Sequence, residues 1–314
     1  MTTSRRGFLA GAGLTGAAVL GGCAVAPGGQ SAPKGAGLAK RVVLIALDGI
    51  RTDGLGQAKT PHLDALFAEG SFSNTTRDVM PSVTLPNWTS ILCGVGPEQH
   101  GVTDNGWTPK KHRLDAVSRD GQGYLPSVFS ELKRQIPGAK TAFYWNWKPL
   151  FNPYNPATLD EAAFEANDGF KGNYGKAFRF LEKHRAEPTL VFLYDVHTDH
   201  AGHRHKWMSP EYIRSIEEAD EAVGELVARL KAANLFADTH FLFLTDHGGV
   251  GHGHGGVSPE EMIVPWGIVG PGVRKGFDLR VNDTVNTAPT VLRLFGAKAP
   301  ACWTGRVAEA VFER

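Results

Sequence analysis

Three segments of the sequence combine aspartate, histidine and glycine, residue types that often surround a metal ion. They are 47–49 (LDG), 195–203 (DVHTDHAGH) and 245–256 (TDHGGVGHGHGG), and each follows or ends an apolar run. Alone, each has an ordinary explanation, because an aspartate after a strand often caps a helix and a single histidine is usually structural. Together they supply at least three carboxylates and at least three imidazoles. This mixture of oxygen and nitrogen ligands suits zinc.

A fourth segment, 80–90 (MPSVTLPNWTS), places a hydroxyl group near the start of a helix. Pro86 is typical of a first helical turn, so Thr84 or Leu85 lies at the amino end. Free backbone N–H groups and the positive end of the helix dipole make that position suitable for a phosphate. Two interpretations stay open: Thr84 reacts with a bound phosphate, or it only caps the helix.

Alternating apolar runs and helical patterns indicate how these segments are positioned. Apolar runs typical of buried strands occupy 42–47, 141–145, 189–194, 240–244 and 263–269, and helical patterns occupy 61–68, 125–134, 162–184, 210–233 and 287–295. The alternation predicts an α/β fold with a largely parallel sheet flanked by helices. The carboxyl ends of such strands meet at one edge, where functional groups collect. We expect one domain over 40–314, with loop elaborations at about 107–125 and 146–170.

The ordered set of motifs resembles the alkaline phosphatase superfamily, most closely its type I phosphodiesterase/nucleotide pyrophosphatase branch, from about residue 41 to 295. The resemblance implies a doubly wound sheet, two zinc ions per chain and a phospho-threonine intermediate. It implies that Thr84 is the nucleophile and that Asn105 holds a phosphate oxygen. The implied ligands of one zinc are Asp48, Asp246, His247 and the nucleophile Thr84 itself, and those of the other are Asp199, His203 and His254.

The implied activity is hydrolysis of phosphodiester or nucleotide pyrophosphate bonds in a small-molecule substrate. Two zinc ions, three aspartates and a Thr84 alkoxide sum to zero charge. Nothing in the sequence places Arg77 at the site, where it could bind a dianionic phosphate. Both features favour a monoanionic diester. The alternative is a phosphomonoesterase or phosphonate hydrolase on the same two-zinc core. A sulfatase does not fit, because the sequence around Cys93 lacks the C/S-x-P-x-R context. A complete ligand set disfavours a non-catalytic zinc-binding surface lipoprotein.

The sequence also departs from the family pattern. Larger nucleotide pyrophosphatases have a long insertion before the last histidine ligand, whereas here only 248–253 intervene, so nucleotide specificity is not implied. His252 is an alternative to His254 as the last histidine ligand, and the position of His254 before two glycines favours His254. Asp195 and His197 are alternatives to Asp199 and His203 as ligands, and Asp195 is also a candidate for orienting a ligand.

Aromatic residues concentrate near the predicted site, at Trp107 and in the segment 143–154. Strand alternation requires that some of them belong to the core. The others are open to two interpretations: ordinary packing, or a stacking wall for a base or another flat leaving group.

Charge and the amino terminus bear on partners and location. With 33 basic and 32 acidic residues, the chain offers no electrostatic case for a nucleic-acid polymer. Residues 1–22 resemble a twin-arginine export signal, with Arg5 and Arg6 before a weakly apolar run. We expect cleavage before Cys23 and a lipid on it, with 24–26 as a rival cleavage site. Residues 23–39 then form a flexible tether.

The expected product is periplasmic or anchored in a bacterial membrane, with the lipid at Cys23 as its only membrane contact. A disulfide between Cys93 and Cys302 is compatible with that compartment and is left open, as are the natural substrate and the oligomeric state.

Overall fold

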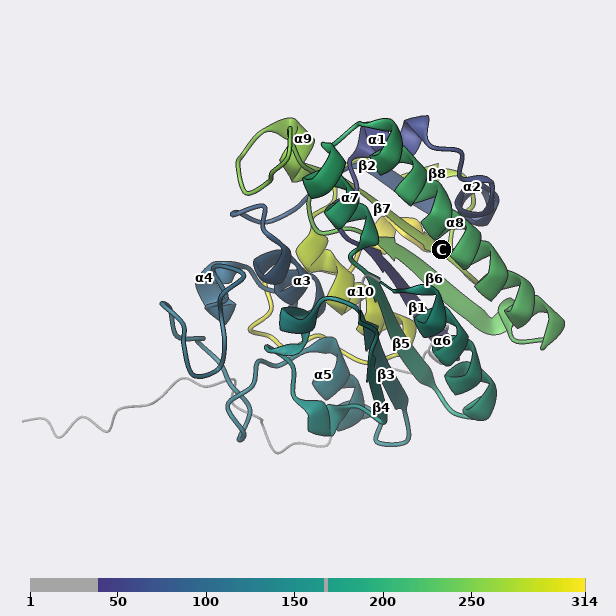
Figure 1. The fold of residues 1–314 in the computed structure, drawn as a ribbon. Coiled ribbons are helices and arrows are strands. Elements are labelled where there is room, and N and C mark those ends of the chain that lie inside the picture. The colour runs from purple at the N-terminus through teal and green to yellow at the C-terminus, as the bar shows by residue number, and fades with distance from the viewer. Residues whose placement is uncertain (1–38, 167–168, 314) are drawn as a thin grey trace, which may run out of the picture.

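The computed structural model describes residues 39–166 and 169–313, which build one eight-stranded sheet with helices on both faces (Figure 1). The strands lie in the order β4-β3-β5-β1-β6-β7-β2-β8. Their bounds are β1 Arg41–Leu47, β2 Ser71–Arg77, β3 Lys140–Trp145, β4 Glu161–Phe164, β5 Thr189–Asp195, β6 Thr239–Leu244, β7 Ile263–Val269 and β8 Phe277–Asp278. The predicted α/β fold is confirmed.

Strand direction brings the candidate residues to one edge of the sheet. Strands β4, β3, β5, β1 and β6 pair in parallel, whereas β7 is antiparallel to both β6 and β2. The carboxyl ends of β1, β5 and β6 therefore meet, and β7 begins at the same edge. Asp48, Asp195 and Asp246 lie at or just after those three strand ends.

The central strands are apolar throughout because both faces of the sheet are covered. Alternate side chains of β1 enter two cores: Val42 and Leu44 pack on the face covered by α3, α5 and α10, and Val43 and Ile45 on the face covered by α2, α6 and α8. The helices are α1 Thr52–Gln57, α2 Pro61–Ala68, α3 Thr84–Cys93, α4 Pro97–His100, α5 Val128–Gln135, α6 Lys171–Lys183, α7 His197–His205, α8 Pro210–Ala232, α9 Pro259–Met262 and α10 Thr287–Leu294.

Two expectations about the elements need correction. The single helix expected over 162–184 is wrong at its start, because β4 forms the edge strand there and α6 begins only at Lys171. The His-rich segment after β5, which is absent from the helices expected from the sequence, largely forms the helix α7. The helices expected at 61–68, 210–233 and 287–295 are present with ends that differ by at most one residue.

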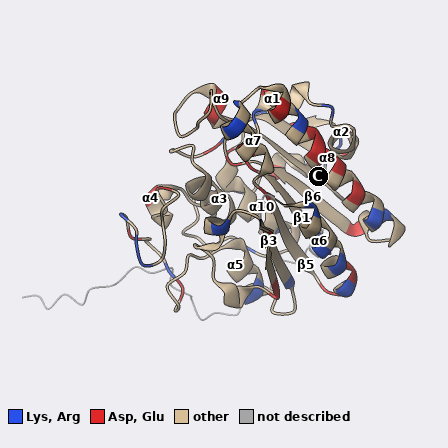
Figure 2. Cartoon of the chain, in the orientation of Figure 1, with Lys and Arg blue, Asp and Glu red and all other residues tan. Residues whose placement is uncertain are grey.

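Charged residues recur along α6 and α8, whereas the central strands carry few of them (Figure 2). Within the described ranges, none of the helices combines the length and the hydropathy that a membrane span requires. The predicted export signal at 1–22, the lipid at Cys23 and all but the last residue of the tether lie outside those ranges. Cys93 is a buried free thiol, so it does not form the disulfide with Cys302 that the sequence left open.

Candidate active site

Asp48, directly after β1, is fully buried at the carboxyl edge of the sheet. Its Oδ2 accepts hydrogen bonds from the indole Nε1 of Trp88 (3.0 Å) and from the hydroxyl of Tyr194. Its Oδ1 has no hydrogen-bond partner and lies 3.5 Å from Nε2 of His247. The same Nε2 is 3.2 Å from Oδ2 of Asp246. Asp48, Asp246 and His247 therefore turn their ligand atoms toward one common point.

Thr84 is the first residue of α3 and borders this group. Its Oγ1 lies 3.2 Å from Nε2 of His247, and the capping position of the helix belongs to Val83. Asn105 joins the same helix end, because its Oδ1 accepts a hydrogen bond from the backbone N–H of Leu85 (2.8 Å). That bond leaves the Nδ2 donors of Asn105 for another acceptor. These contacts argue against the interpretation of Thr84 as only a helix cap.

A second group lies on α7 and on the loop after β6. Asp199 and His203 are four residues apart and share one face of α7, with Nε2 of His203 3.5 Å from Oδ1 of Asp199. Nε2 of His254 lies 3.7 Å from the same oxygen. The ring of His254 stacks on that of His247 with centroids 3.7 Å apart. The ligand atoms of Asp199, His247 and His254 lie within 4.8 Å of one another. His247 thus borders both groups, whereas His203 lies at the exposed rim.

Backbone carbonyl groups fix the orientation of the three histidines. Each Nδ1 lies 2.8–2.9 Å from a carbonyl oxygen; for His203, His247 and His254 these oxygens belong to His252, Gly248 and Ser82, respectively. A carbonyl oxygen can only accept, so each Nδ1 carries the proton and each Nε2 presents its lone pair. This is the tautomer that a metal ligand coordinating through Nε2 requires.

Three buried carboxylates meet here without a cationic side chain. Oδ1 of Asp48, Oδ1 of Asp199 and Oδ2 of Asp246 are buried and lack hydrogen-bond partners. Burial raises the pKa of Asp199 to about 7, and burial together with neighbouring carboxylates raises the pKa of Asp48 and of Asp246 well above the usual range. No lysine or arginine of the described ranges pairs with these three side chains. The donor set therefore fits divalent cations.

The raised carboxyl pKa values predict how the stability of the metal-free protein depends on pH. At pH 7 the carboxyl group of Asp199, whose pKa is about 7, is partly protonated in the folded chain and loses that proton on unfolding, so the free energy of unfolding falls as pH rises above 7. The raised pKa values of Asp48 and Asp246 act in the same direction. Burial lowers the pKa of His247 and His254, which acts in the opposite direction, but only below about pH 6.5. We expect thermal unfolding of the metal-free protein at a lower temperature at pH 9 than at pH 7.

Asp78 lies outside both groups and provides the control for that prediction. It is buried without hydrogen bonds to its carboxyl oxygens, and burial raises its pKa to about 8. Asp78→Asn should therefore remove part of the pH dependence of stability whether or not a divalent cation is added. A divalent cation that binds the site should abolish the part that comes from the site, because the metal replaces the protons. A melting temperature of the metal-free protein that rises from pH 7 to pH 9 would contradict the prediction.

Within the described ranges, the groups of candidate metal ligands contain none of the competing residues. His252 is exposed, and its Nδ1 donates to the carbonyl of His203 (3.1 Å). Asp195 is buried, and its Oδ1 accepts from the backbone N–H of His197 (2.8 Å), whose ring pairs with Glu218 (2.7 Å). Arg77 is exposed on β2. The structure therefore brings together the residues that the resemblance favoured.

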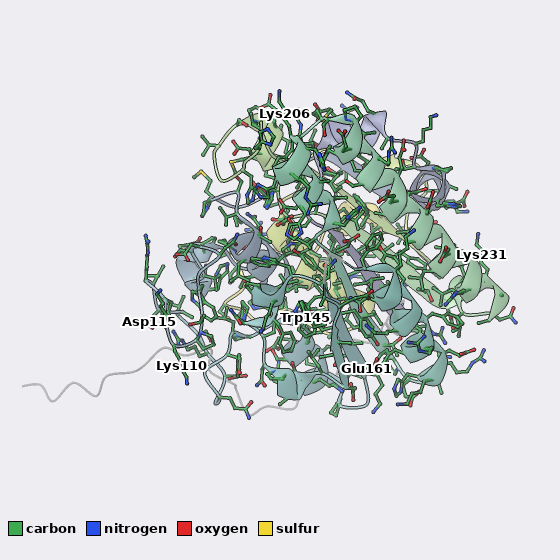
Figure 3. All side chains as sticks on the ribbon, in the orientation of Figure 1. Lys110, Asp115, Trp145, Glu161, Lys206 and Lys231 are labelled. Carbon is green, nitrogen blue, oxygen red and sulfur yellow. The ribbon has the colours of Figure 1, made fainter. Side chains whose placement is uncertain are left out.

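The aromatic residues contribute mainly to packing. Trp107, Phe143 and Tyr154 are buried in the core that covers one face of the sheet. Trp145, at the carboxyl end of β3 and labelled in Figure 3, is half-buried and stacks on Phe151 with ring centroids 4.6 Å apart. Packing accounts for these positions.

Two residues that contact Asp48 were missed by the sequence analysis. Trp88 follows Thr84 by four residues and lies on the same face of α3, so helical spacing could have indicated it. Tyr194 is one residue of a uniformly apolar strand, and nothing in the sequence distinguishes it from its neighbours.

Comparison with known proteins agrees with this geometry. A family model described as type I phosphodiesterase/nucleotide pyrophosphatase matches residues 42–263, a span that contains every candidate ligand. The chain belongs to the type I phosphodiesterase/nucleotide pyrophosphatase family. Relatives in this family include the bis(5'-adenosyl)-triphosphatase ENPP4 of Bos taurus, 27% identical over 66% of the chain and 47% of the relative. A pyrophosphatase/phosphodiesterase of Schizosaccharomyces pombe, named as uncharacterised, is 28% identical over 66% of the chain and 44% of the relative.

The chain thus spans somewhat under half the length of these two relatives. Among solved structures, murine ectonucleotide pyrophosphatase/phosphodiesterase 5 superposes with a TM-score of 0.73 at 16% identity, over 88% of this chain and 100% of that chain. This likeness shows that the family fold is shared.

Proposed function

We propose that this protein is an exported zinc-dependent phosphoesterase that hydrolyses phosphodiester or nucleotide pyrophosphate bonds through a phospho-threonine intermediate. The position of Thr84 carries the proposal: its hydroxyl lies at the amino end of α3, 3.2 Å from a histidine that borders both groups of candidate ligands. Two names support it. The bovine relative is named as a bis(5'-adenosyl)-triphosphatase, and the murine structure is described as an inactive threonine-to-alanine variant in complex with AMP.

The proposed reaction has two displacements at phosphorus. The oxygen of Thr84 gives its proton to solvent and attacks phosphorus, and the bond to the leaving oxygen breaks so that the leaving group takes the electron pair and is then protonated. Water attacks the same phosphorus, the bond to the threonine oxygen breaks, and that oxygen takes a proton, which releases a phosphate monoester and restores the threonine hydroxyl. When bound, two zinc ions would supply the positive charge that makes a threonine hydroxyl nucleophilic near neutral pH and stabilises the leaving oxygen.

The residues of this chain orient the substrate. Asn105, held by the N–H of Leu85, donates from Nδ2 to a non-bridging phosphate oxygen, and the amino end of α3 favours the negative charge that develops there. Both are uncharged groups. They suit a phosphodiester with one negative charge better than a monoester with two.

A substrate comparison tests this proposal. We expect kcat/KM of the zinc-loaded protein for an aryl phosphodiester to exceed that for the matching monoester. Asn105→Ala should lower diester turnover by about a hundredfold, the usual effect of one lost oxyanion donor. Asn152 offers a matched control, because its amide donates to the carbonyl of Trp107 (3.3 Å), whereas the amide of Asn105 accepts from α3, so Asn152→Ala should leave turnover nearly unchanged.

A preference for the monoester by tenfold or more, about 1.4 kcal/mol in transition-state stabilisation, would overturn the diester assignment. It would favour the phosphomonoesterase alternative and would call for a cation besides the two zinc ions, with Arg77 as the first residue to replace.

A further inference from the structure

One buried tryptophan, Trp207, contacts the three chain segments that carry the candidate aspartate and histidine ligands. Its side chain is 2% exposed. Its indole Nε1 donates to the carbonyl of Gly49 (2.9 Å), the residue after Asp48. Gly49 in turn donates its N–H to Oδ1 of Asp246 (3.1 Å). The indole is therefore bonded directly to the segment that follows β1 and is linked through Gly49 to the segment that follows β6.

The ring of Trp207 also supports both histidines of the second group. Its edge meets the imidazole of His203 with centroids 5.0 Å apart and that of His254 at 5.9 Å. Two glycines allow this approach: a Cβ at Gly202 on α7 would lie 2.6 Å from the ring, and one at Gly249 only 2.4 Å. No side chain fits at either position, so α7 and the loop after β6 lie directly against the indole.

The backbone around Trp207 is strained, which is unexpected for a residue that only fills space. Lys206 has φ = 82° and Met208 has φ = 69°, although neither is glycine. Such conformations persist where the surrounding structure imposes them, and they concentrate at functional sites. Here the two turns direct the indole inward, while Lys206 projects from the surface (Figure 3). The backbone N–H of Trp207 donates to the carbonyl of Gly251 (2.8 Å), which ties it again to the loop of His254.

We propose that Trp207 is a positioning residue that sets the distance between His203 and His254 for one of the two metal ions. This assignment rests on the proposed zinc-dependent function. Zinc–nitrogen bonds are about 2.0–2.1 Å long, so ligands displaced by a few tenths of an ångström bind the metal less tightly. The two imidazoles belong to different segments, and Trp207 touches both.

The test compares two buried tryptophans. Trp266 on β7 is 1% exposed, and its Nε1 donates to Thr287 (3.1 Å), outside both ligand groups. Trp207→Phe and Trp266→Phe should both lower the temperature of thermal unfolding. Only Trp207→Phe should weaken binding of the zinc ion that His203 and His254 would hold, by about tenfold or more in its dissociation constant, which competition with a chelator measures.

A stabilised background separates positioning from folding. Lys206→Gly relieves the backbone strain at the residue before Trp207 without changing the indole, and it should raise the melting temperature by about 2 °C. The double variant Lys206→Gly/Trp207→Phe should then recover stability without recovering zinc affinity. Two results would overturn the role of Trp207 while leaving the proposed function intact. One is unchanged zinc affinity in this double variant, and the other is an equal loss of zinc affinity in Trp266→Phe. A wild-type protein that retained no zinc would overturn the proposed function as well.

Discussion

Thr84→Ala should lower kcat on the order of a thousandfold or more while the protein still folds, because the variant removes the attacking oxygen. The hydroxyl faces His247 (3.2 Å) and does not occupy the capping position of α3, so its loss takes no backbone hydrogen bond from the helix. Steady-state kinetics of the zinc-loaded variant on an aryl diester measure the effect. Thr84→Ser keeps a hydroxyl at the same place and should retain appreciable activity.

Thr89 gives a matched control on the same helix. It is a buried threonine whose hydroxyl donates to the carbonyl of Leu85 (2.6 Å) and contacts no candidate ligand. Thr89→Ala should lower stability and leave kcat within a few-fold of wild type. Near wild-type turnover by Thr84→Ala would show that Thr84 has no chemical role.

The second large effect concerns the two histidines of the Gly-His-Gly-His segment. His254→Ala should reduce the zinc content after dialysis from two ions to one and lower kcat on the order of a hundredfold or more, since a catalytic metal contributes several kcal/mol. Nε2 of His254 lies 3.7 Å from Asp199, and its Nδ1 is held by the carbonyl of Ser82 (2.9 Å). Elemental analysis gives the stoichiometry.

His252→Ala is the comparison for this experiment. The exposed ring of His252 contacts the carbonyl of His203, whereas the carbonyl of His252, which holds His203, survives the substitution. Zinc content should therefore stay near two. If His252→Ala released zinc and His254→Ala retained it, the ligand assignment would be reversed, and one ion or none in zinc-loaded wild type would contradict a two-zinc site.

The elements that could be predicted best from the sequence are those whose burial produces a clear pattern of apolar residues. Strands β1, β5 and β6 are buried on both faces, so their runs of apolar residues are continuous. Strand β2 (SFSNTTR) lies near the sheet edge and is too polar to resemble a buried strand. Helix α7 (HTDHAGHRH) has almost no apolar face, and its residues serve the site rather than the core.

For the candidate site, residue type and order were informative, but contacts between distant segments were not. Asp48, Asp246 and His247 follow strand ends, where an α/β sheet collects its functional groups. The indole and hydroxyl that hold Oδ2 of Asp48 come from positions 88 and 194, more than 100 residues apart. Only the folded chain shows that apolar-looking aromatic residues orient a carboxylate.

The carbonyl groups that orient the three histidines have an evolutionary consequence. Because the acceptors at positions 82, 248 and 252 are main-chain atoms, a side-chain substitution at those positions does not delete them. Orienting contacts of this kind are inherited with the path of the backbone. Side chains around the mouth of the site can therefore change while the tautomers of the histidines stay the same. Under the proposed function, substrate preference can diverge without a change in the orientation of the histidine ligands.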